Sequence, residues 1–372
     1  MSPHLLPTDL RCDPFPERWP ADYRHRARVL GPGNPLLQSG TAHPSELLPD
    51  PESRADPTGE CAVSPLPFLV RKHRDRVLVL IAARCFLHCR FCFRRGQPER
   101  FRTAPDTAAW HDILSWLGAH PEVEEVILSG GDPLTLPDRR LGEISADLTA
   151  LPHLRRWRIH TRAPVVAPQR VTPELARAVA GGLPLRVVYH ANHPAELGSG
   201  VDRATRRLQE AGVALANQGV LLCGVNDDPQ VLLELFGRLG KTGVLPHYLH
   251  HPDRAPGNAR FRVPLRRGLA IHQALVGLAE QRGQARWVPP YVVDLPSGAG
   301  KCPVAALRPV CGERHGDRVR TRFRWVPPED WDGAAGSCEW WDVWEATGNG
   351  AWVQDAAADP CASPITDGAA TA

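Results

Sequence analysis

Residues 76–95 read RVLVLIAARCFLHCRFCFRR, and this stretch decides the fold. The six residues after Arg76 are all apolar, which is typical of a strand buried on both faces. Three cysteines follow in a CxxxCxxC spacing: Cys85, Cys89 and Cys92. Three thiolates can bind three irons of a 4Fe–4S cluster and leave the fourth iron open to a small molecule. We therefore expect an iron–sulfur site at the carboxyl end of a sheet strand.

Two other interpretations of the cysteines remain open. Cysteines are often buried as small apolar residues, and three of them can be part of a zinc site. A zinc ribbon needs a second pair of ligands nearby, whereas the next cysteine, Cys223, is distant and isolated. The ten cysteines are spread over a long chain with no apolar signal peptide at Met1, so we expect a reducing, cytoplasmic location and no disulfide framework.

Length and charge limit the function classes. A chain of 372 residues suits one barrel-sized core with terminal extensions. We expect an irregular or helical extension over 1–75, a catalytic barrel over 76–307 and a carboxyl-terminal extension over 308–372 with a disordered tail. The net charge of +3 gives no reason to expect a nucleic acid or membrane partner, and no apolar run is long enough to span a bilayer.

Alternating apolar and amphipathic stretches predict strands and helices from Arg76 onward. The predicted strands are Arg76–Ala82, Glu125–Leu128, Arg156–His160, Arg186–His190, Ala214–Val220 and Leu245–Leu249. The predicted helices include Thr107–Ala119, Pro173–Gly181, Arg203–Ala211, Pro229–Leu239 and Leu265–Gln281. Six strand–helix units favour an α/β fold, a partial TIM-like (β/α)6 barrel whose chemistry lies at the carboxyl ends of the strands.

Beyond about Arg308 the regular pattern is predicted to end. This region is rich in tryptophan: Trp325, Trp331, Trp340, Trp341, Trp344 and Trp352. We interpret it as a packed flap, with a binding platform as the alternative.

Two glycine-rich segments are candidate binding sites. Ser129–Pro133 reads SGGDP directly after a predicted strand, and glycines there let the backbone approach a ligand closely. Asp294–Lys301 reads DLPSGAGK, which does not fit the phosphate-binding GxxxxGK[ST] pattern because Cys302 follows the lysine. The chain has only three lysines, Lys72, Lys241 and Lys301. We interpret Lys301 as a lysine on a flexible loop that forms a Schiff base with an aldehyde cofactor, the alternative being an exposed loop lysine.

Taken in order, these motifs resemble the lysine 2,3-aminomutase family. The likeness covers about residues 56 to 305 and includes RIHTRAPVV at 158–166 and GVND at 224–227. Members of that family are radical S-adenosylmethionine (SAM) enzymes that also use pyridoxal 5'-phosphate (PLP). The resemblance implies an isomerase that moves the α-amino group of L-lysine to the β-carbon and gives β-lysine.

The resemblance also implies roles for individual residues. Cys85, Cys89 and Cys92 would bind the 4Fe–4S cluster, and the SAM site would include Gly130, Gly131 and Asp132. Lys301 would carry PLP, which Arg76 and Gln218 would contact. Arg94 would bind the substrate carboxylate, because its planar fork suits a carboxylate, and Asp253 and Asp294 would face the distal ammonium.

The implied partners are a small-molecule amino acid substrate and an external electron donor of the flavodoxin or ferredoxin type, and we expect a homo-oligomer. Some family members hold zinc between a cysteine after the GVND turn and a carboxyl-terminal cysteine cluster. Here Asp228 follows that turn, and Cys338 and Cys361 stand alone, so no zinc is predicted.

Three other functions stay open. One is the family branch whose β-lysine modifies elongation factor P, and another is an aminomutase acting on arginine, whose guanidinium two aspartates can also bind. The third is a non-enzymatic iron–sulfur scaffold or sensor.

Overall fold

One curved sheet of nine strands organises the molecule, and the strands follow each other in chain order from β1 to β9. The computed structural model describes residues 15–97, 103–296, 298–315, 318–325, 338–345 and 366–367. The strands are β1 (Leu69–Val70), β2 (Arg76–Ala82), β3 (Glu125–Gly130), β4 (Arg156–Thr161), β5 (Leu185–Tyr189), β6 (Ala214–Val220), β7 (Leu245–His250), β8 (Tyr291–Leu295) and β9 (Gly300–Pro303). Strands β2 to β8 are parallel, and the two edge strands, β1 and β9, are antiparallel to their neighbours.

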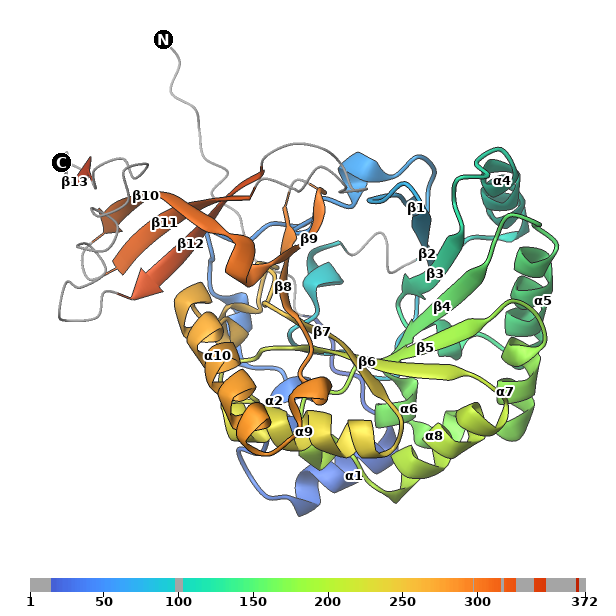
Figure 1. Ribbon diagram of the computed structural model, residues 1–372, viewed down its shortest axis with the longest axis horizontal. Helices are drawn as coiled ribbons and strands as arrows, with labels where there is room; N and C mark the ends of the chain where they lie inside the picture. The colour runs from blue at the N-terminus through green and yellow to red at the C-terminus, as the bar shows by residue number, and fades with distance from the viewer. Residues whose placement is uncertain are drawn as a thin grey trace, which may run out of the picture.

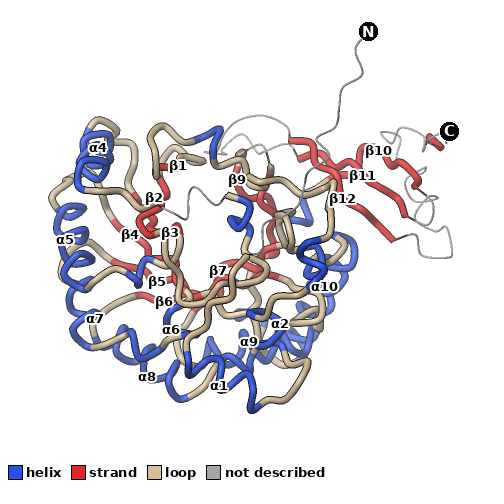
Figure 2. The backbone as a smooth tube through the Cα atoms, turned by 180° about the vertical axis from the view of Figure 1, so that it is seen from behind, coloured by secondary structure: helices blue, strands red, loops and turns tan. Residues whose placement is uncertain are grey.

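Helices cover the outer face of this sheet (Figures 1 and 2). They are α4 (Thr107–Gly118), α5 (Asp138–Thr149), α6 (Ala163–Val166), α7 (Pro173–Ala180), α8 (Ser199–Glu210), α9 (Pro229–Lys241) and α10 (Leu265–Gln281). Several begin at a side-chain cap: Asp106 accepts from Ala109 N, and Thr172 accepts from Leu175 N. The result is an open, partial (β/α) barrel, which confirms the predicted architecture.

The amino-terminal lead-in packs against the barrel instead of forming a core of its own. It contains α1 (Ala21–Val29) and α2 (Pro35–Gly40), and the side chains of Tyr23 and Leu36 are buried in the main core. The domain boundaries after residues 75 and 307 remain a prediction.

Two strands of the catalytic region were not predicted. Lys301 was expected on a flexible glycine-rich loop, but it lies on β9, which pairs antiparallel with β8. The glycines allow the tight connection between β8 and β9, because Gly298 and Gly300 have positive φ angles of +79° and +93°. Such short strands carry too little alternation to be recognised from a single sequence.

The prediction that regular structure ends near Arg308 is wrong. A second sheet contains β10 (Arg308–His315), β11 (Arg318–Trp325), β12 (Cys338–Glu345) and β13 (Thr366–Asp367), in the order β12–β11–β10–β13. Residues 318–325 read RVRTRFRW, in which arginine alternates with Val, Thr, Phe and Trp, and this period of two is typical of a strand with one buried face. Trp325 is buried, whereas Trp331, Trp352 and the predicted disordered tail, apart from β13, lie outside the described residues.

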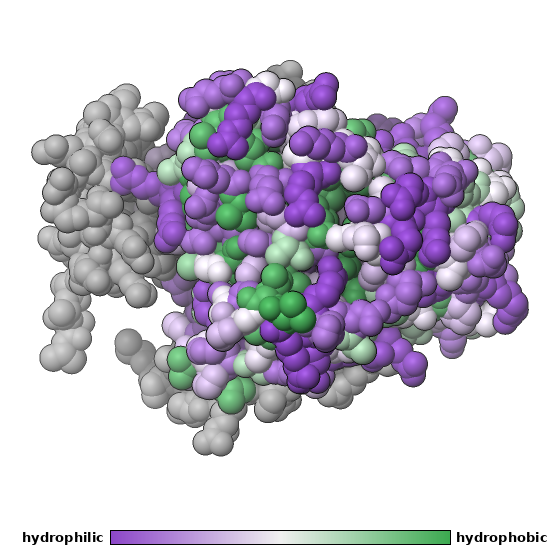
Figure 3. All heavy atoms as spheres, turned by 90° about the horizontal axis from the view of Figure 1, so that it is seen from below, coloured by the Kyte–Doolittle hydropathy of each residue, from purple (hydrophilic) through white to green (hydrophobic). Residues whose placement is uncertain are grey.

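The face shown in Figure 3 is mostly hydrophilic, with hydrophobic residues in patches between polar ones. Among the described helices none combines the length and the apolar character needed to cross a bilayer.

Candidate active site

The three cysteines lie on the loop that leaves the carboxyl end of β2, and all three are free and partly buried. Burial, together with the neighbouring Cys92, raises the pKa of the Cys85 thiol well above its usual range. Burial and the neighbouring Cys89 raise the pKa of Cys92 to about 11. These mutual effects show that the thiols form one group, as the sequence predicts.

This group fits a 4Fe–4S cluster, in which each thiolate meets a different iron. In the described ranges no group of three His, Cys, Asp or Glu side chains is arranged to hold a metal ion. The nitrogen Nη1 of Arg162 lies 2.7 Å from Cys89 Sγ, and a cation at this distance favours the thiolate that metal binding requires.

Buried charge fixes the conformation of this cysteine loop. Glu46, from the lead-in, accepts hydrogen bonds from Arg90 Nε and Arg95 Nη2, each at 2.9 Å. Arg90 also donates to the carbonyl oxygen of Phe15 at 2.9 Å. Removing one partner of such a buried pair costs about 3–5 kcal/mol, because the other charge is left uncompensated. No sequence signal pointed to Glu46, which is 44 residues away from Arg90.

The two glycines after β3 lie against the beginning of the cysteine loop. Gly130 has φ of +108°, and a Cβ there would be 2.6 Å from the carbonyl oxygen of Ala82. A Cβ on Gly131 would overlap the carbonyl oxygen of Arg84. Gly131 N donates to Ala82 O at 2.6 Å, so the two backbones are joined. Only glycine fits these two positions.

Asp132 is buried, and its carboxylate accepts hydrogen bonds from neighbouring segments of the fold. It accepts hydrogen bonds from Thr161 Oγ1 at 2.6 Å, Arg162 N at 2.9 Å, Leu134 N at 3.0 Å and Ala163 N at 3.1 Å. Asp132 therefore ties the glycine turn to the end of β4. Its contact with SAM stays a prediction.

Arg94 is buried beside the cysteine loop and carries a carboxylate partner that the sequence did not reveal. Its Nε and Nη2 donate to Glu60 Oε2 at 3.1 Å and Oε1 at 2.5 Å, and its Nη1 donates to Ser129 Oγ at 3.2 Å. A guanidinium has five N–H donors, and the bonds to Glu60 and Ser129 use three of them. One N–H of Nη1 and one of Nη2 therefore remain for a ligand. Glu60 thus orients Arg94 without using all of its donors.

Lys301 and Asp294 face each other across the β8–β9 pair, where they are register partners. Lys301 Nζ donates to Asp294 Oδ1 at 3.1 Å, and Asp294 Oδ2 lies 3.2 Å from His250 Nδ1. Burial acts to lower the pKa of Lys301, but Asp294 raises it above its ordinary value. Burial acts to raise the pKa of Asp294, but Lys301 and His250 hold it well below its ordinary value.

Asp253 lies near this pair, as the sequence predicts. Burial and the negative charge of Asp294 raise the pKa of Asp253 well above its usual range, while Lys72 and Lys301 act to lower it. Lys72 donates to Thr58 O at 2.8 Å, and burial lowers its pKa although Asp294 opposes the change. Glu60 and Lys72 belong to the same region, because the charge of each acts on Asp253.

Gln218 lies inside the barrel among histidines. Its Nε2 lies 2.8 Å from His190 Nε2 and 3.4 Å from His160 Nδ1. The Nε2 atoms of His160 and His250 are buried and have no hydrogen-bond partner within the described part of the chain. Such buried polar atoms call for a polar ligand, so this interior fits a coenzyme with ring and phosphate oxygens close to Lys301.

Arg76 is the site residue predicted farthest from the cysteine loop along β2. It lies at the amino-terminal end of β2, where its Nη2 is 3.0 Å from His73 Nδ1 and its Nη1 is 3.3 Å from Asp75. Its predicted contact with PLP stays a prediction.

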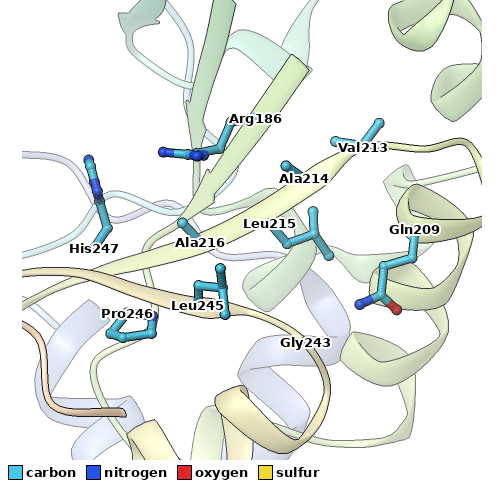
Figure 4. Close-up of a pocket in the computed structure, with 10 residues that line it drawn as sticks. All are labelled: Arg186, Gln209, Val213, Ala214, Leu215, Ala216, Gly243, Leu245, Pro246 and His247. Carbon is cyan, nitrogen blue, oxygen red and sulfur yellow. The ribbon is translucent and has the colours of Figure 1, made fainter. Parts of the chain in front are cut away.

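A pocket of about 260 Å3 lies at the opposite, amino-terminal ends of β5, β6 and β7. Figure 4 shows Arg186 and His247 directed toward the same space there. None of the predicted site residues lines this pocket, so the cysteine loop, and not this pocket, marks the candidate active site.

Sequence reasoning assigned no role to Glu60, Lys72 or the barrel histidines, although it placed His160 and His190 at strand carboxyl ends. One signal was available for Lys72, because it is one of only three lysines in the chain. His160, His190 and His250 each stand within one residue of the last residue of a strand, which is where site residues of such barrels lie. Glu60 gave no signal, because it lies in an irregular segment.

Residues 79–236 match the Radical SAM superfamily, which agrees with the position of the cysteine loop after the first long strand. A protein of this class uses a 4Fe–4S cluster and SAM. A solved structure, Streptococcus suis SuiB bound to S-adenosylmethionine, is 15% identical with a TM-score of 0.44 and covers 57% of this chain and 49% of that chain.

The chain belongs to the lysine 2,3-aminomutase family, whose members are isomerases. It is 33% identical to the L-lysine 2,3-aminomutase of Methanococcus maripaludis over 82% of this chain and 71% of that protein. It is 38% identical to the Escherichia coli protein of the same name over 67% of this chain and 72% of that protein. With the Acetoanaerobium sticklandii protein of that name the identity is 37% over 74% of this chain, and the match spans 66% of the relative's length.

Proposed function

We propose that this protein moves the α-amino group of L-lysine to the β-carbon and releases β-lysine. The observation that carries the proposal is the hydrogen bond of 3.1 Å between Lys301 and Asp294, with Asp253 beside it. Lys301 is an amine suited to bind an aldehyde coenzyme, and the two aspartates are suited to bind the substrate's distal ammonium. Relatives named L-lysine 2,3-aminomutase support this assignment.

The two ends of the substrate would meet opposite charges. Arg94 keeps donors at the end of its fork for the α-carboxylate, while Glu60 and Ser129 hold the guanidinium in place. Asp253 and Asp294 would bind the distal ammonium, because a buried cation is tolerated only when opposed by negative charge. The same pair disfavours substrates with neutral or acidic side chains.

The cofactors would be held by the residues that the sequence singles out. The proposed ligand sets are Cys85, Cys89 and Cys92 for the cluster, the turn at Gly130, Gly131 and Asp132 for SAM, and Lys301, Gln218 and Arg76 for PLP. When bound, the cluster with SAM supplies a carbon radical that abstracts hydrogen, and PLP supplies a conjugated system that spreads an unpaired electron.

Asp294 and His250 orient the amine that is to carry the coenzyme. Asp294 Oδ1 accepts from Lys301 Nζ, and His250 contacts the other carboxylate oxygen. Attachment of an aldehyde requires the neutral amine, so the proton at Nζ must leave when the coenzyme binds. Asp294 is positioned to bind that proton or the substrate ammonium that replaces it.

The proposal includes three features outside the site. An external one-electron donor of the flavodoxin or ferredoxin type would reduce the cluster, and the protein would act as a cytoplasmic homo-oligomer.

One anaerobic assay tests the proposed function. Protein reconstituted with iron, sulfide and PLP is incubated with SAM and a chemical reductant, and separate reactions contain lysine, arginine or glutamate. Chiral chromatography should detect β-lysine from lysine and no β-amino acid from glutamate. Turnover of arginine alone would reassign the substrate, and feeble turnover that yields the opposite β-lysine enantiomer would favour the elongation factor P branch. Absence of any β-amino acid product and of SAM cleavage would contradict the proposal.

Lys301→Ala should abolish covalent coenzyme attachment and reduce β-lysine formation by about a thousandfold or more, because the other amine of this region, Lys72, is held by the carbonyl oxygen of Thr58. Attachment is measured by borohydride reduction followed by mass spectrometry of the peptide that contains residue 301. The matched control is Lys241→Ala, which removes an exposed lysine at the end of α9 and should leave both readouts unchanged. Equal labelling of the wild type and Lys301→Ala would contradict the role of Lys301.

A further inference from the structure

Arg162 makes a contact for which the proposed reaction assigns no role. It directly follows β4, is 6% exposed, and donates from Nη1 to Cys89 Sγ at 2.7 Å. Its guanidinium also lies over the ring of Phe91, 5.2 Å from the ring centroid. A buried cation thus lies against one of the three predicted cluster ligands.

We propose that Arg162 is a positioning residue that raises the reduction potential of the cluster through its N–H···S hydrogen bond to Cys89 and its positive charge. The inference rests on the proposed function only for the statement that Cys85, Cys89 and Cys92 bind a cluster. It requires neither lysine nor PLP.

The direction of the effect follows from the charge of the two redox states. A chemical reductant adds one electron to the cluster, and part of the added negative charge resides on the cysteine sulfurs. A hydrogen-bond donor and a positive charge stabilise the more negative state more strongly, so reduction becomes easier. The contact is buried, and electrostatic interactions are stronger there than in water.

Glu196 holds the guanidinium in this orientation. Arg162 Nη2 donates to Glu196 Oε1 at 2.5 Å, and the same carboxylate accepts from Tyr23 Oη at 2.7 Å and Asn192 N at 2.6 Å. Because Glu196 is fixed by these donors, the ion pair is a dipole whose positive end faces Cys89. The negative end is bound to the other terminal nitrogen, Nη2, and not to the nitrogen that contacts sulfur, so its opposing effect at the sulfur is smaller.

The backbone of Arg162 has a separate role that side-chain variants preserve. Arg162 N donates to Asp132 Oδ2 at 2.9 Å and thereby helps to fix the glycine turn. A substitution at position 162 therefore removes the contact with sulfur while keeping the contact with Asp132. The effect on the cluster can be measured without loss of the turn.

The test compares Arg162→Met, Arg162→Lys and a matched control, Arg26→Met. Arg26 lies on α1 and donates to Glu196 O and Val165 O, each at 3.0 Å, so the control removes an arginine that binds the same elements but no sulfur. Full-length protein is reconstituted with iron and sulfide, without lysine or PLP. Anaerobic redox titration with dithionite is followed by electron paramagnetic resonance of the reduced cluster.

We expect the Arg162→Met midpoint to be more negative than that of the wild type. The ratio of reduced to oxidised cluster at a fixed potential should fall about tenfold, which corresponds to about 59 mV for one electron. Arg162→Lys keeps the charge, but an ammonium lacks the planar pair of nitrogens that contacts Cys89 and Glu196 together. Its midpoint potential should therefore lie between those of the wild type and Arg162→Met. Arg26→Met should titrate like the wild type.

An Arg162→Met protein with wild-type iron content and a wild-type midpoint would overturn the inference. If that variant takes up no cluster, Arg162→Lys decides: a more negative midpoint supports the inference, and an unchanged one overturns it. The proposed function fails differently, because a wild-type protein with a normal reduced cluster but no β-lysine product contradicts the reaction and leaves the role of Arg162 intact. A wild-type protein that assembles no cluster overturns both.

Discussion

Asp253 shows how a binding residue can reduce the stability of the fold that contains it. Its pKa is raised well above the ordinary value by burial and by Asp294, so the folded protein resists its ionisation. Nothing opposes ionisation in the unfolded chain. At neutral pH the ionised carboxylate is therefore a cost to folding that substrate binding would offset.

Asp253→Asn should raise the free energy of unfolding at pH 7.5 by roughly 1 kcal/mol. The gain should shrink as the pH falls toward about 4, where the unfolded carboxyl is also protonated. The same variant should raise the KM for lysine at least about tenfold, since a hydrogen bond to a charged group is lost. Denaturant unfolding at several pH values and steady-state kinetics measure the two effects.

Asp112→Asn, at an exposed position of α4, is the control and should change neither quantity. Loss of stability in Asp253→Asn at neutral pH would show that its carboxylate is stabilised by the neighbouring lysines, contrary to this prediction.

For single residues, the sequence singled out side chains that the structure brings together, but it did not reveal the charges around them. Lys301 and Asp294 were both predicted, and the structure pairs them at 3.1 Å. Glu60 was not, because the fold brings it to Arg94 from 34 residues away and no local pattern encodes that contact. Charges that neutralise a site usually come from other segments, so they are found only when the chain is folded.

Among the secondary-structure elements, the glycine turn after β3 is the point where two strand ends are joined. Gly131 leaves no room for a Cβ beside Arg84 O, and Gly131 N is bonded to Ala82 O. Any side chain at position 131 must displace the first residues of the cysteine loop.

Gly131→Ala should lower the iron content of reconstituted protein at least about twofold and destabilise the fold by roughly 1–3 kcal/mol, because the loop must shift to accept the methyl group. Iron analysis and thermal unfolding are the measurements. Gly118→Ala is the matched control, since a Cβ there meets nothing within 4 Å and helical alanine is favoured over glycine. Full cluster assembly in Gly131→Ala would contradict the close approach of the two backbones.

The strands with continuous apolar sequence were predicted well, and the short ones were not. β2, which is apolar after Arg76, and β6, which reads ALANQGV, begin and end where the sequence predicts. β8 and β9 contain five and four residues and enclose a proline- and glycine-rich connection, so local sequence favoured a loop. The hydrogen-bonded pairing of β8 with β9 gives both segments their strand conformation, and a single sequence does not reveal this pairing.

For the molecule as a whole, the interior of the half-barrel is lined with neutral histidines. Burial lowers the pKa of His190 and of His247 to about 3, assisted by nearby arginines. In the unfolded chain a histidine titrates near 6.5. A folded pKa below the unfolded one means that protons bind preferentially to the unfolded chain, so stability falls as the pH drops below about 6.5.

Between pH 7 and pH 5 the free energy of unfolding should fall by roughly 1–2 kcal/mol for each such histidine. His247→Gln should lose less stability over this interval than the wild type, because glutamine keeps an acceptor for Arg158, 3.2 Å from His247 Nε2, and does not titrate. His111→Gln, at an exposed position of α4, should behave like the wild type. Urea unfolding at the two pH values is the measurement, and identical losses in all three proteins would refute the prediction.

The bonds from Glu46 to Arg90 and Arg95 involve no iron and no sulfide. The loop that presents the cysteines is therefore shaped by the polypeptide itself, and biogenesis can proceed in two separate stages. We expect folding to come first and the inorganic cluster to enter a loop that is already shaped. Cells that make this protein in air would accordingly accumulate a compact, inactive precursor that later anaerobic repair can convert, instead of an aggregate.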